Sequence, residues 1–134
     1  MTPARFRDLA LSLPEATEGS HHGIVDFRLR GKIFATLGNP DPSFAMVALT
    51  PDEQALFVEA EPTTFVPVLG GWGRRGSTRV RLKAADDATV RSALTAAWRR
   101  IAPKTLLAAQ TEAANDAEAS LAKRSVAKRP RSRF

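Results

Sequence analysis

The stretch that decides the fold is His21-His22-Gly23-Ile24-Val25-Asp26-Phe27-Arg28-Leu29-Arg30-Gly31-Lys32-Ile33-Phe34-Ala35-Thr36-Leu37. Apolar and polar residues alternate through Ile24–Leu29, which predicts a β-strand with Asp26 and Arg28 on the face away from the core. Arg30-Gly31 predicts a tight turn, because glycine readily adopts the positive φ that two-residue hairpins need. Lys32–Leu37 is then the returning strand, so this stretch predicts an antiparallel hairpin.

Helices and further strands are predicted around this hairpin. A helix begins at Thr2-Pro3 and ends before Pro14, because threonine caps a helix and proline favours its first position. Thr50 to Glu53 forms a capping box that starts a second helix. Apolar residues at helical spacing end at Ile101 in a third helix, which is capped by Asp86 or Asp87. The remaining expected segments are a polar loop at Glu15–Gly23 and strands at Phe44–Leu49, Thr63–Leu69 and Thr78–Leu82.

These elements predict an α+β fold. Its mainly antiparallel sheet has about five strands, with helices packed on one face. Pro103 breaks or kinks the third helix and marks the end of a first domain at residues 1–103. Residues 104–122 are alanine-rich and poor in large apolar side chains, which predicts a peripheral helix. Residues 123–134 form a basic tail.

Composition excludes several classes of protein. The 134 residues are 43% apolar and 25% charged, as expected of a globular domain. There is no cysteine, which excludes disulfides and thiolate metal sites. No apolar run approaches the roughly 20 residues that a membrane-spanning helix needs. We therefore expect a cytoplasmic protein without a membrane span.

The net charge of +6 is concentrated at one end of the sequence. The chain has 20 basic and 14 acidic residues, and the basic tail holds six of the basic residues and none of the acidic ones. The excess therefore lies entirely in Lys123, Arg124, Lys128, Arg129, Arg131 and Arg133. A basic tail on a neutral body indicates contact with a polyanion, while a solubilising tail explains it equally well.

Two further groups of cations accompany the predicted strands. Five basic residues with no intervening acid follow a glycine-rich segment, and three of them are expected on one strand face: Arg74, Arg75, Arg79, Arg81 and Lys83. The first hairpin adds Arg28, Arg30 and Lys32. Charges that protect an exposed edge strand from aggregation would explain the first group. Two basic hairpins together favour binding to nucleic acid over that alternative.

Three aromatic side chains could line a cleft. His21 and His22 are adjacent, so they point to opposite sides of an extended chain and cannot easily share a metal ion. Neither histidine has an obvious nucleophile or carboxylate partner in the sequence, so we expect no metal, no cofactor and no catalysis. Trp72 lies among glycines, where it could fill the edge of the core or stack on a flat ligand.

Several short motifs, in this order and spacing, resemble those of the MmcQ/YjbR-like family of small bacterial proteins. The motifs are Leu11-Ser12-Leu13-Pro14, His21-His22-Gly23, Phe27-Arg28, Gly31-Lys32-Ile33-Phe34-Ala35-Thr36-Leu37, and Gly71-Trp72-Gly73 after Phe65-Val66-Pro67. The resemblance runs from the first helix to about Pro103. This chain departs from it at Ser77, where members often have an aromatic residue, and in the added sequence after Pro103.

The resemblance implies a CyaY-like α+β fold with two hairpin wings, and members of this family are commonly described as DNA-binding. Our first hypothesis is a non-catalytic nucleic-acid-binding module that uses both basic hairpins and the basic tail. The alternative is a domain that binds a small molecule or a partner protein. Its cleft would lie between His21-His22-Gly23 and Gly71-Trp72-Gly73, with Arg28 and Lys32 holding an anion. A monomer or weak dimer is expected in both cases.

Overall fold

The computed structural model describes residues 1–109, and the chain divides into two units, Met1–Ile101 and Ala102–Phe134. The first unit contains four α-helices, α1 (Pro3–Leu11), α2 (Pro51–Ala60), α3 (Gly71–Arg74) and α4 (Asp87–Ile101). Its six strands are β1 (Ala16–His21), β2 (Ile24–Leu29), β3 (Lys32–Leu37), β4 (Phe44–Ala48), β5 (Phe65–Pro67) and β6 (Ser77–Arg81). A short 3-10 helix, η1 (Leu82–Ala84), follows β6.

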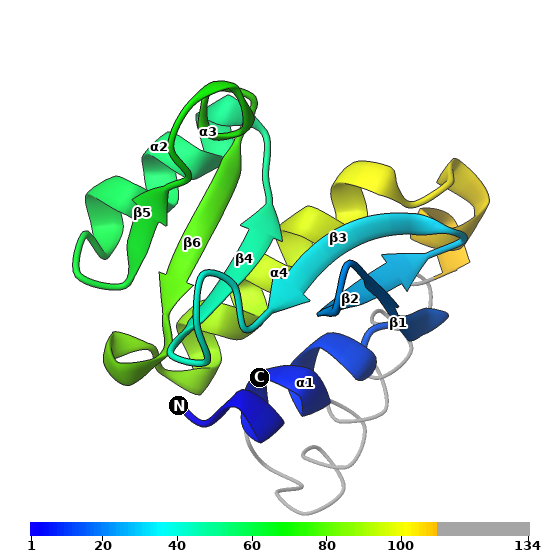
Figure 1. The fold of residues 1–134 in the computed structure, drawn as a ribbon. Helices are drawn as coiled ribbons and strands as arrows, with labels where there is room; N and C mark the ends of the chain where they lie inside the picture. The colour runs from blue at the N-terminus through cyan, green and yellow to red at the C-terminus, as the bar shows by residue number, and fades with distance from the viewer. Residues whose placement is uncertain (110–134) are drawn as a thin grey trace, which may run out of the picture. The chain divides into compact units, whose positions relative to one another are not determined.

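All six strands form one antiparallel sheet in the order β1-β2-β3-β4-β6-β5 (Figure 1). The first four strands are neighbours in both sequence and space. The last two exchange places, so that β6 lies between β4 and β5. The predicted α+β class with a mainly antiparallel sheet is confirmed, and the sheet has one strand more than the five expected.

Two tight turns build the β1–β2–β3 meander. Arg30 and Gly31 have φ values of 50° and 84°, and His22 and Gly23 have 50° and 76°. Positive φ at both central residues is the type I′ geometry, whose twist matches that of paired strands. The predicted turn at Arg30-Gly31 is confirmed. The His22-Gly23 turn repeats it eight residues earlier and closes a second hairpin that the sequence analysis had assigned to a loop.

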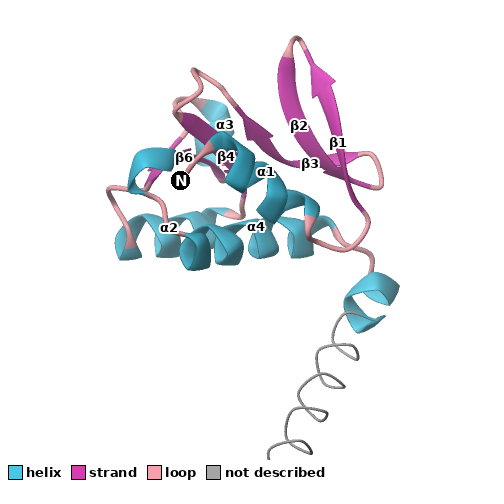
Figure 2. Ribbon diagram, turned by 90° about the horizontal axis from the view of Figure 1, so that it is seen from below, coloured by secondary structure: helices cyan, strands magenta, loops and turns pink. Residues whose placement is uncertain are grey.

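The core lies between the sheet and the helices α1 and α4. Helix α4 packs against α1, β3 and β4, and the strands lie above helices α2 and α4 in Figure 2. The predicted apolar stripe of α4 is confirmed, because Val90, Ala93, Leu94, Ala97 and Trp98 are all buried. The Trp98 indole Nε1 donates a hydrogen bond of 2.9 Å to the Pro14 carbonyl oxygen, which ties α4 to the chain beyond α1.

The helix starts also follow the sequence signals. Thr50 and Glu53 form the predicted capping box at the start of α2. The Asp86 carboxylate accepts a hydrogen bond of 2.8 Å from the Thr89 backbone N–H, so Asp86 is the residue that caps α4. Helix α1 ends at Leu11, two residues before the predicted end, with Ser12 as its C-cap.

Two sequence-based expectations and one alternative explanation are wrong. Ala16–His21 is strand β1 and not a loop. Strand β6 has hydrogen-bonded neighbours on both sides, so its arginines do not protect a sheet edge. Lys83 lies in η1 and therefore does not share a strand face with Arg79 and Arg81. The glycine-rich segment before β6 contains the single helical turn α3.

The second unit is described only to residue 109. Residues 104–109 are helical, as expected for the start of the alanine-rich segment. The rest of that predicted helix and the whole basic tail lie outside the described residues. The proposed domain boundary at Pro103 remains a prediction. No helix in the described part of the chain is long and apolar enough to cross a membrane.

Candidate functional site

A cavity of about 570 Å³ opens on the face of the sheet that the helices leave uncovered. Met46 and Ala48 of β4 line it, whereas Ala45 and Val47, between and beside them, are fully buried in the core. Because successive strand residues point to opposite faces, the cavity and the helical layer lie on opposite sides of the sheet. The full lining is His21, Ile24, Ile33, Thr36, Asn39, Met46, Ala48, Leu49, Val68, Trp72, Arg75, Ser77, Arg79 and Arg100.

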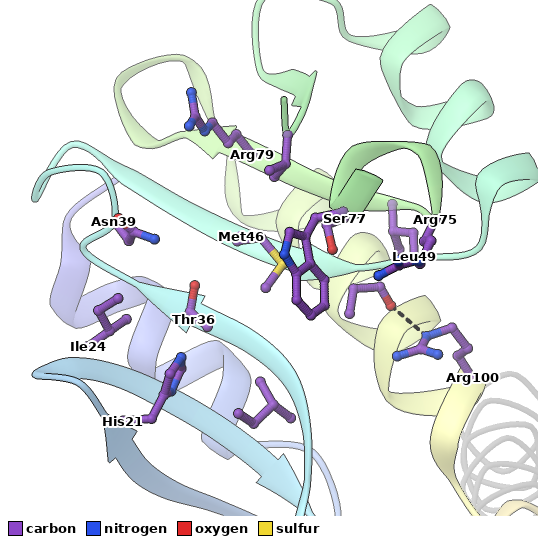
Figure 3. A pocket seen from close by; sticks show the side chains of 14 residues that line it. His21, Ile24, Thr36, Asn39, Met46, Leu49, Arg75, Ser77, Arg79 and Arg100 are labelled. Atoms are coloured by element: carbon purple, nitrogen blue, oxygen red, sulfur yellow. Dashed lines mark hydrogen bonds between the residues drawn. The ribbon is translucent and has the colours of Figure 1, made fainter. Parts of the chain in front are cut away.

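The charged lining of the cavity is entirely basic. Arg75, Arg79 and Arg100 line it, and no aspartate or glutamate of residues 1–109 does. Figure 3 shows these arginines on three different segments around the opening, with Arg100 reaching it from the end of α4. The Arg100 Nε donates to the Ala48 carbonyl oxygen at 2.8 Å, which anchors the side chain while its terminal amino groups remain available. The site is therefore built to attract an anion.

Trp72 is presented by close packing of the backbone around α3. A Cβ atom on Gly73 would lie 1.6 Å from the Val68 carbonyl oxygen, and one on Gly76 would lie 1.9 Å from the Leu49 carbonyl oxygen. Only glycine fits at either position. The Gln54 side-chain amide donates to the carbonyl oxygens of Gly73 and Ser77 at 2.9 and 3.0 Å, which fixes the same segment to α2.

The Trp72 side chain itself remains largely uncovered. Its exposed fraction is 67%, and the Arg75 guanidinium lies 5.4 Å from the ring centroid in a cation–π contact. The other tryptophan, Trp98, is fully buried. An exposed indole beside an arginine is a stacking surface for a flat ligand, so the structure places Trp72 at the cavity and not in the core.

His21 has a carboxylate partner that the sequence analysis did not find. Its Nδ1 lies 2.8 Å from Asp26 Oδ2, and Arg28 donates to both oxygens of the same carboxylate, at 2.7 Å from Nε and 3.0 Å from Nη2. Asp26 is completely buried beneath these two side chains. The expectation that no carboxylate orients a histidine is therefore wrong.

The hairpin register and Gly19 bring this cluster together. Gly19 pairs with Asp26 across β1 and β2, and a Cβ atom there would lie only 3.0 Å from Asp26 Oδ1 and 3.1 Å from Arg28 Nε. The hydrogen bond from Arg28 is the main cause that lowers the pKa of Asp26, against the opposing effect of burial, and the hydrogen bond with His21 lowers it further. Asp26 therefore stays ionised and holds Arg28 in place.

The other cations of the first hairpin do not reach the cavity. Arg30 forms an ion pair with Glu15 at 2.9 Å, and Lys32 is exposed. His22 lies in the type I′ turn and does not line the cavity either. Of the three residues suggested for a cleft, the structure brings His21 and Trp72 together around one cavity. The suggested anion anchors Arg28 and Lys32 are not part of its lining.

The cations of the second group remain free of acidic partners. Among the described residues, no ion pair is recorded for Arg74, Arg75, Arg79, Arg81 or Lys83. Arg79 lies 5.9 Å from the centroid of the Phe44 ring. Arg74, adjacent to the cavity-lining Arg75, is exposed, and so is Arg81, two residues after Arg79. Lys83 follows in η1.

A model of the YjbR family matches residues 11–100. The chain belongs to the YjbR family. The matched segment contains every residue that lines the cavity, including Arg100 at its last position. No curated protein matches the chain. A search of solved structures also gives no match.

Several cavity residues of this YjbR-family protein were not identified from the sequence. Thr36 and Met46 belong to correctly predicted strands, but no role was predicted for the strand face that carries them. Arg100 lies 28 residues after Trp72 at the end of a helix, where a charged residue is ordinary. Within the described residues, no group of three histidine, cysteine, aspartate or glutamate side chains is arranged to hold a metal ion.

Proposed function

We propose that this YjbR-family protein binds nucleic acid through the open face of its sheet, with a preference for single strands. The observation that carries the proposal is the cavity itself, which three arginines and no acidic residue of the described part of the chain line, with an exposed tryptophan beside them. Proteins that bind single strands combine a basic groove along the backbone with aromatic rings on which bases stack. Trp72 supplies such a ring, and Arg75, Arg79 and Arg100 supply the charge.

In this proposal the two basic hairpins do not contribute equally to the contact surface. Arg28 and Arg30 are held by Asp26 and Glu15, so binding through them would first require these ion pairs to be broken or shared. Arg74, Arg75, Arg79 and Arg81 meet no such competition among the described residues. The second basic segment is therefore the main contact in this proposal. The basic tail, residues 123–134, would add attraction of phosphates without sequence preference.

The test is a salt titration of binding, followed by fluorescence anisotropy. A labelled 12-nucleotide single strand and a duplex of the same length are titrated with the full chain between 50 and 200 mM NaCl. Log affinity should fall linearly with log salt concentration, with a slope of about −0.7 for each phosphate contacted in the single strand. The single strand should bind more tightly than the duplex at every salt concentration.

A variant that lacks residues 123–134 separates the two sources of charge. We expect it to bind more weakly and with a shallower salt slope, while its preference for single strands is retained because Trp72 is unchanged. Weak binding that does not respond to salt, equal for the two forms of DNA and unaltered by the deletion, would refute the proposal. A cytoplasmic location and a monomer or weak dimer remain predictions.

A second candidate function is supported by the volume of the cavity. Ligand pockets commonly measure about 300–1,000 Å³, and about 570 Å³ lies within this range. The same site could thus serve a small anionic molecule or the side chain of a partner protein. A thermal-shift screen of anionic metabolites tests this candidate, since a ligand that binds only the native state raises the melting temperature. No shift with any compound, together with salt-dependent DNA binding, would argue against it.

A further inference from the structure

The lining of the cavity combines apolar and cationic side chains. Ile24, Ile33, Met46, Leu49 and Val68 contribute apolar side chains to the lining, and three arginines contribute its charge. In Figure 3, Arg79 and Arg100 lie on opposite sides of Met46. A phosphate or sulfate ion alone would leave these apolar side chains without a partner. The site therefore fits a ligand that combines a flat, weakly polar ring with an anionic group.

Thr36 gives the cavity one buried polar group. Only 6% of this residue is exposed, and its hydroxyl has no hydrogen-bond partner among the described residues. In Figure 3 its oxygen points into the cavity, between His21 and Met46. A buried hydroxyl without a partner is unfavourable, and most such groups in proteins are hydrogen-bonded. A polar atom of a ligand in the cavity would supply the missing partner.

Trp72 provides the flat surface. Its exposed indole lies at the same cavity as Thr36, and Arg75 stands beside the ring. A planar ring on Trp72 would lose contact with water on one face without breaking any hydrogen bond. Heteroaromatic rings also carry polar atoms along their edge, where the Thr36 hydroxyl could be reached.

We propose that the cavity is a binding site for one unpaired nucleotide. Its ring would stack on Trp72, its edge would accept from or donate to the Thr36 hydroxyl, and its phosphate would lie with one of the lining arginines. The ring edge must be free of Watson–Crick pairing, so a duplex cannot occupy the site without opening. This inference rests on the proposed function, whose single-stranded ligand it specifies. A free nucleotide and a nucleotide within a strand share this chemistry.

The experiment measures tryptophan fluorescence of the full chain. Trp98 is fully buried, so quenching by a stacked ring reports on Trp72. The probes are the four deoxynucleoside 5′-monophosphates, an eight-nucleotide single strand of each base, and deoxyribose 5-phosphate, which has the phosphate but no ring. We expect quenching by at least one nucleotide and its oligonucleotide. Deoxyribose 5-phosphate, whose binding is followed by its competition with that nucleotide, should bind at least about 10-fold more weakly.

Thr36→Val tests the hydroxyl without changing the size of the side chain. We expect the variant to bind the preferred nucleotide and its oligonucleotide roughly 3- to 10-fold more weakly, the effect of one hydrogen bond. The melting temperature of the free protein should stay the same or rise, because the variant removes a buried hydroxyl that has no partner. Thr17→Val is the matched control, since Thr17 is exposed on β1 outside the cavity and should leave binding unchanged.

The outcomes separate this inference from the proposed function. Salt-dependent binding of oligonucleotides that Thr36→Val leaves unchanged would overturn the nucleotide site and leave the proposed function standing. Binding of a mononucleotide, weakened by Thr36→Val, without binding of any oligonucleotide would support the site and overturn the proposed function. If neither kind of probe binds, both are wrong. A fall in the melting temperature of free Thr36→Val would show that the hydroxyl serves the fold instead.

Discussion

The two halves of the sheet use their cations in opposite ways. In the β1–β2–β3 half, Arg28 and Arg30 are bound to carboxylates supplied by β2 and by the residue before β1. In the β4–β6–β5 half, Arg75 and Arg79 face a cavity and touch aromatic rings instead. A count of basic residues cannot separate these cases. The difference teaches that the charge available to a ligand depends on where the acids lie in the fold.

Glycines of the two halves are also needed for different reasons. Gly23 and Gly31 of the first half have positive φ, but a Cβ atom at either position would meet nothing within 4 Å. Gly73 and Gly76 of the second half stand against backbone carbonyl groups. Gly23 and Gly31 are therefore needed for the conformation of their turns, whereas Gly73 and Gly76 are needed for close contact between segments.

The largest expected effect is the loss of stability when a side chain is introduced at Gly76. Gly76 combines a φ of +114° with no space for a side chain, so Gly76→Ala should lower the free energy of unfolding by about 3 kcal/mol or more. Gly31→Ala, where space is open, should cost only about 1 kcal/mol. Urea unfolding followed by circular dichroism measures both. Equal losses in the two variants would show that close contact around Gly76 is not important for stability.

The next effect concerns the buried cluster of the first half. Asp26→Asn removes the charge that faces Arg28 and His21, and we expect it to lower the free energy of unfolding by about 3 kcal/mol. This loss is at the low end for a broken buried ion pair, because Arg28 and His21, the two side chains that face Asp26, are partly exposed. Glu15→Gln breaks the exposed pair with Arg30 and is the control, with a much smaller change. Similar losses for both would mean that burial of Asp26 does not strengthen its pair.

The same cluster predicts how stability depends on pH. Arg28, and then His21, lowers the pKa of Asp26 below the ordinary value of about 3.9 that it regains on unfolding. The ionised carboxylate therefore stabilises the native state above about pH 3.9, and this contribution is lost as the pH falls below that value through the native pKa.

The wild type should thus lose stability faster than Asp26→Asn in that range. Urea midpoints measured from pH 7 to pH 2.5 should converge for the two proteins at the acidic end. A constant difference between the two urea midpoints from pH 7 to pH 2.5 would show that protonation of Asp26 does not cause the loss of stability.

The sequence predicted most of the fold because its signals are local. The Arg30-Gly31 turn, the capping box at Thr50 and the apolar stripe of α4 each depend on a few neighbouring residues, and each is confirmed. Strand β1 was missed for a physical reason. It is a polar edge strand without a buried apolar face, so it has no hydrophobic alternation and forms because β2 pairs with it.

The candidate site was less accessible to sequence analysis because its residues meet only across strands. Asp26 was correctly expected on the face away from the core. Its complete burial, however, results from His21 on the neighbouring strand β1, from Arg28 two residues later and from Gly19 opposite. The partners of each arginine also decide which of them face the cavity freely. Such pairings depend on register and on side-chain direction, which residue spacing alone does not give.

The smallest expected effect is the loss of affinity for a single strand when one arginine of either half is removed. Arg79→Ala removes a cation of the second half that lines the cavity and has no acidic partner among the described residues. We expect it to weaken binding of a 12-nucleotide single strand about 10-fold at 100 mM NaCl and to reduce the salt slope by about 0.7, as expected for the loss of one phosphate contact. Arg30→Ala removes a cation of the first half that Glu15 already holds, so affinity should change less than about 2-fold and the salt slope should stay the same. Anisotropy titrations at several salt concentrations measure both variants. If Arg30→Ala weakened binding as much as Arg79→Ala does, Arg30 would exchange Glu15 for phosphate when the strand binds, and the two halves would act alike.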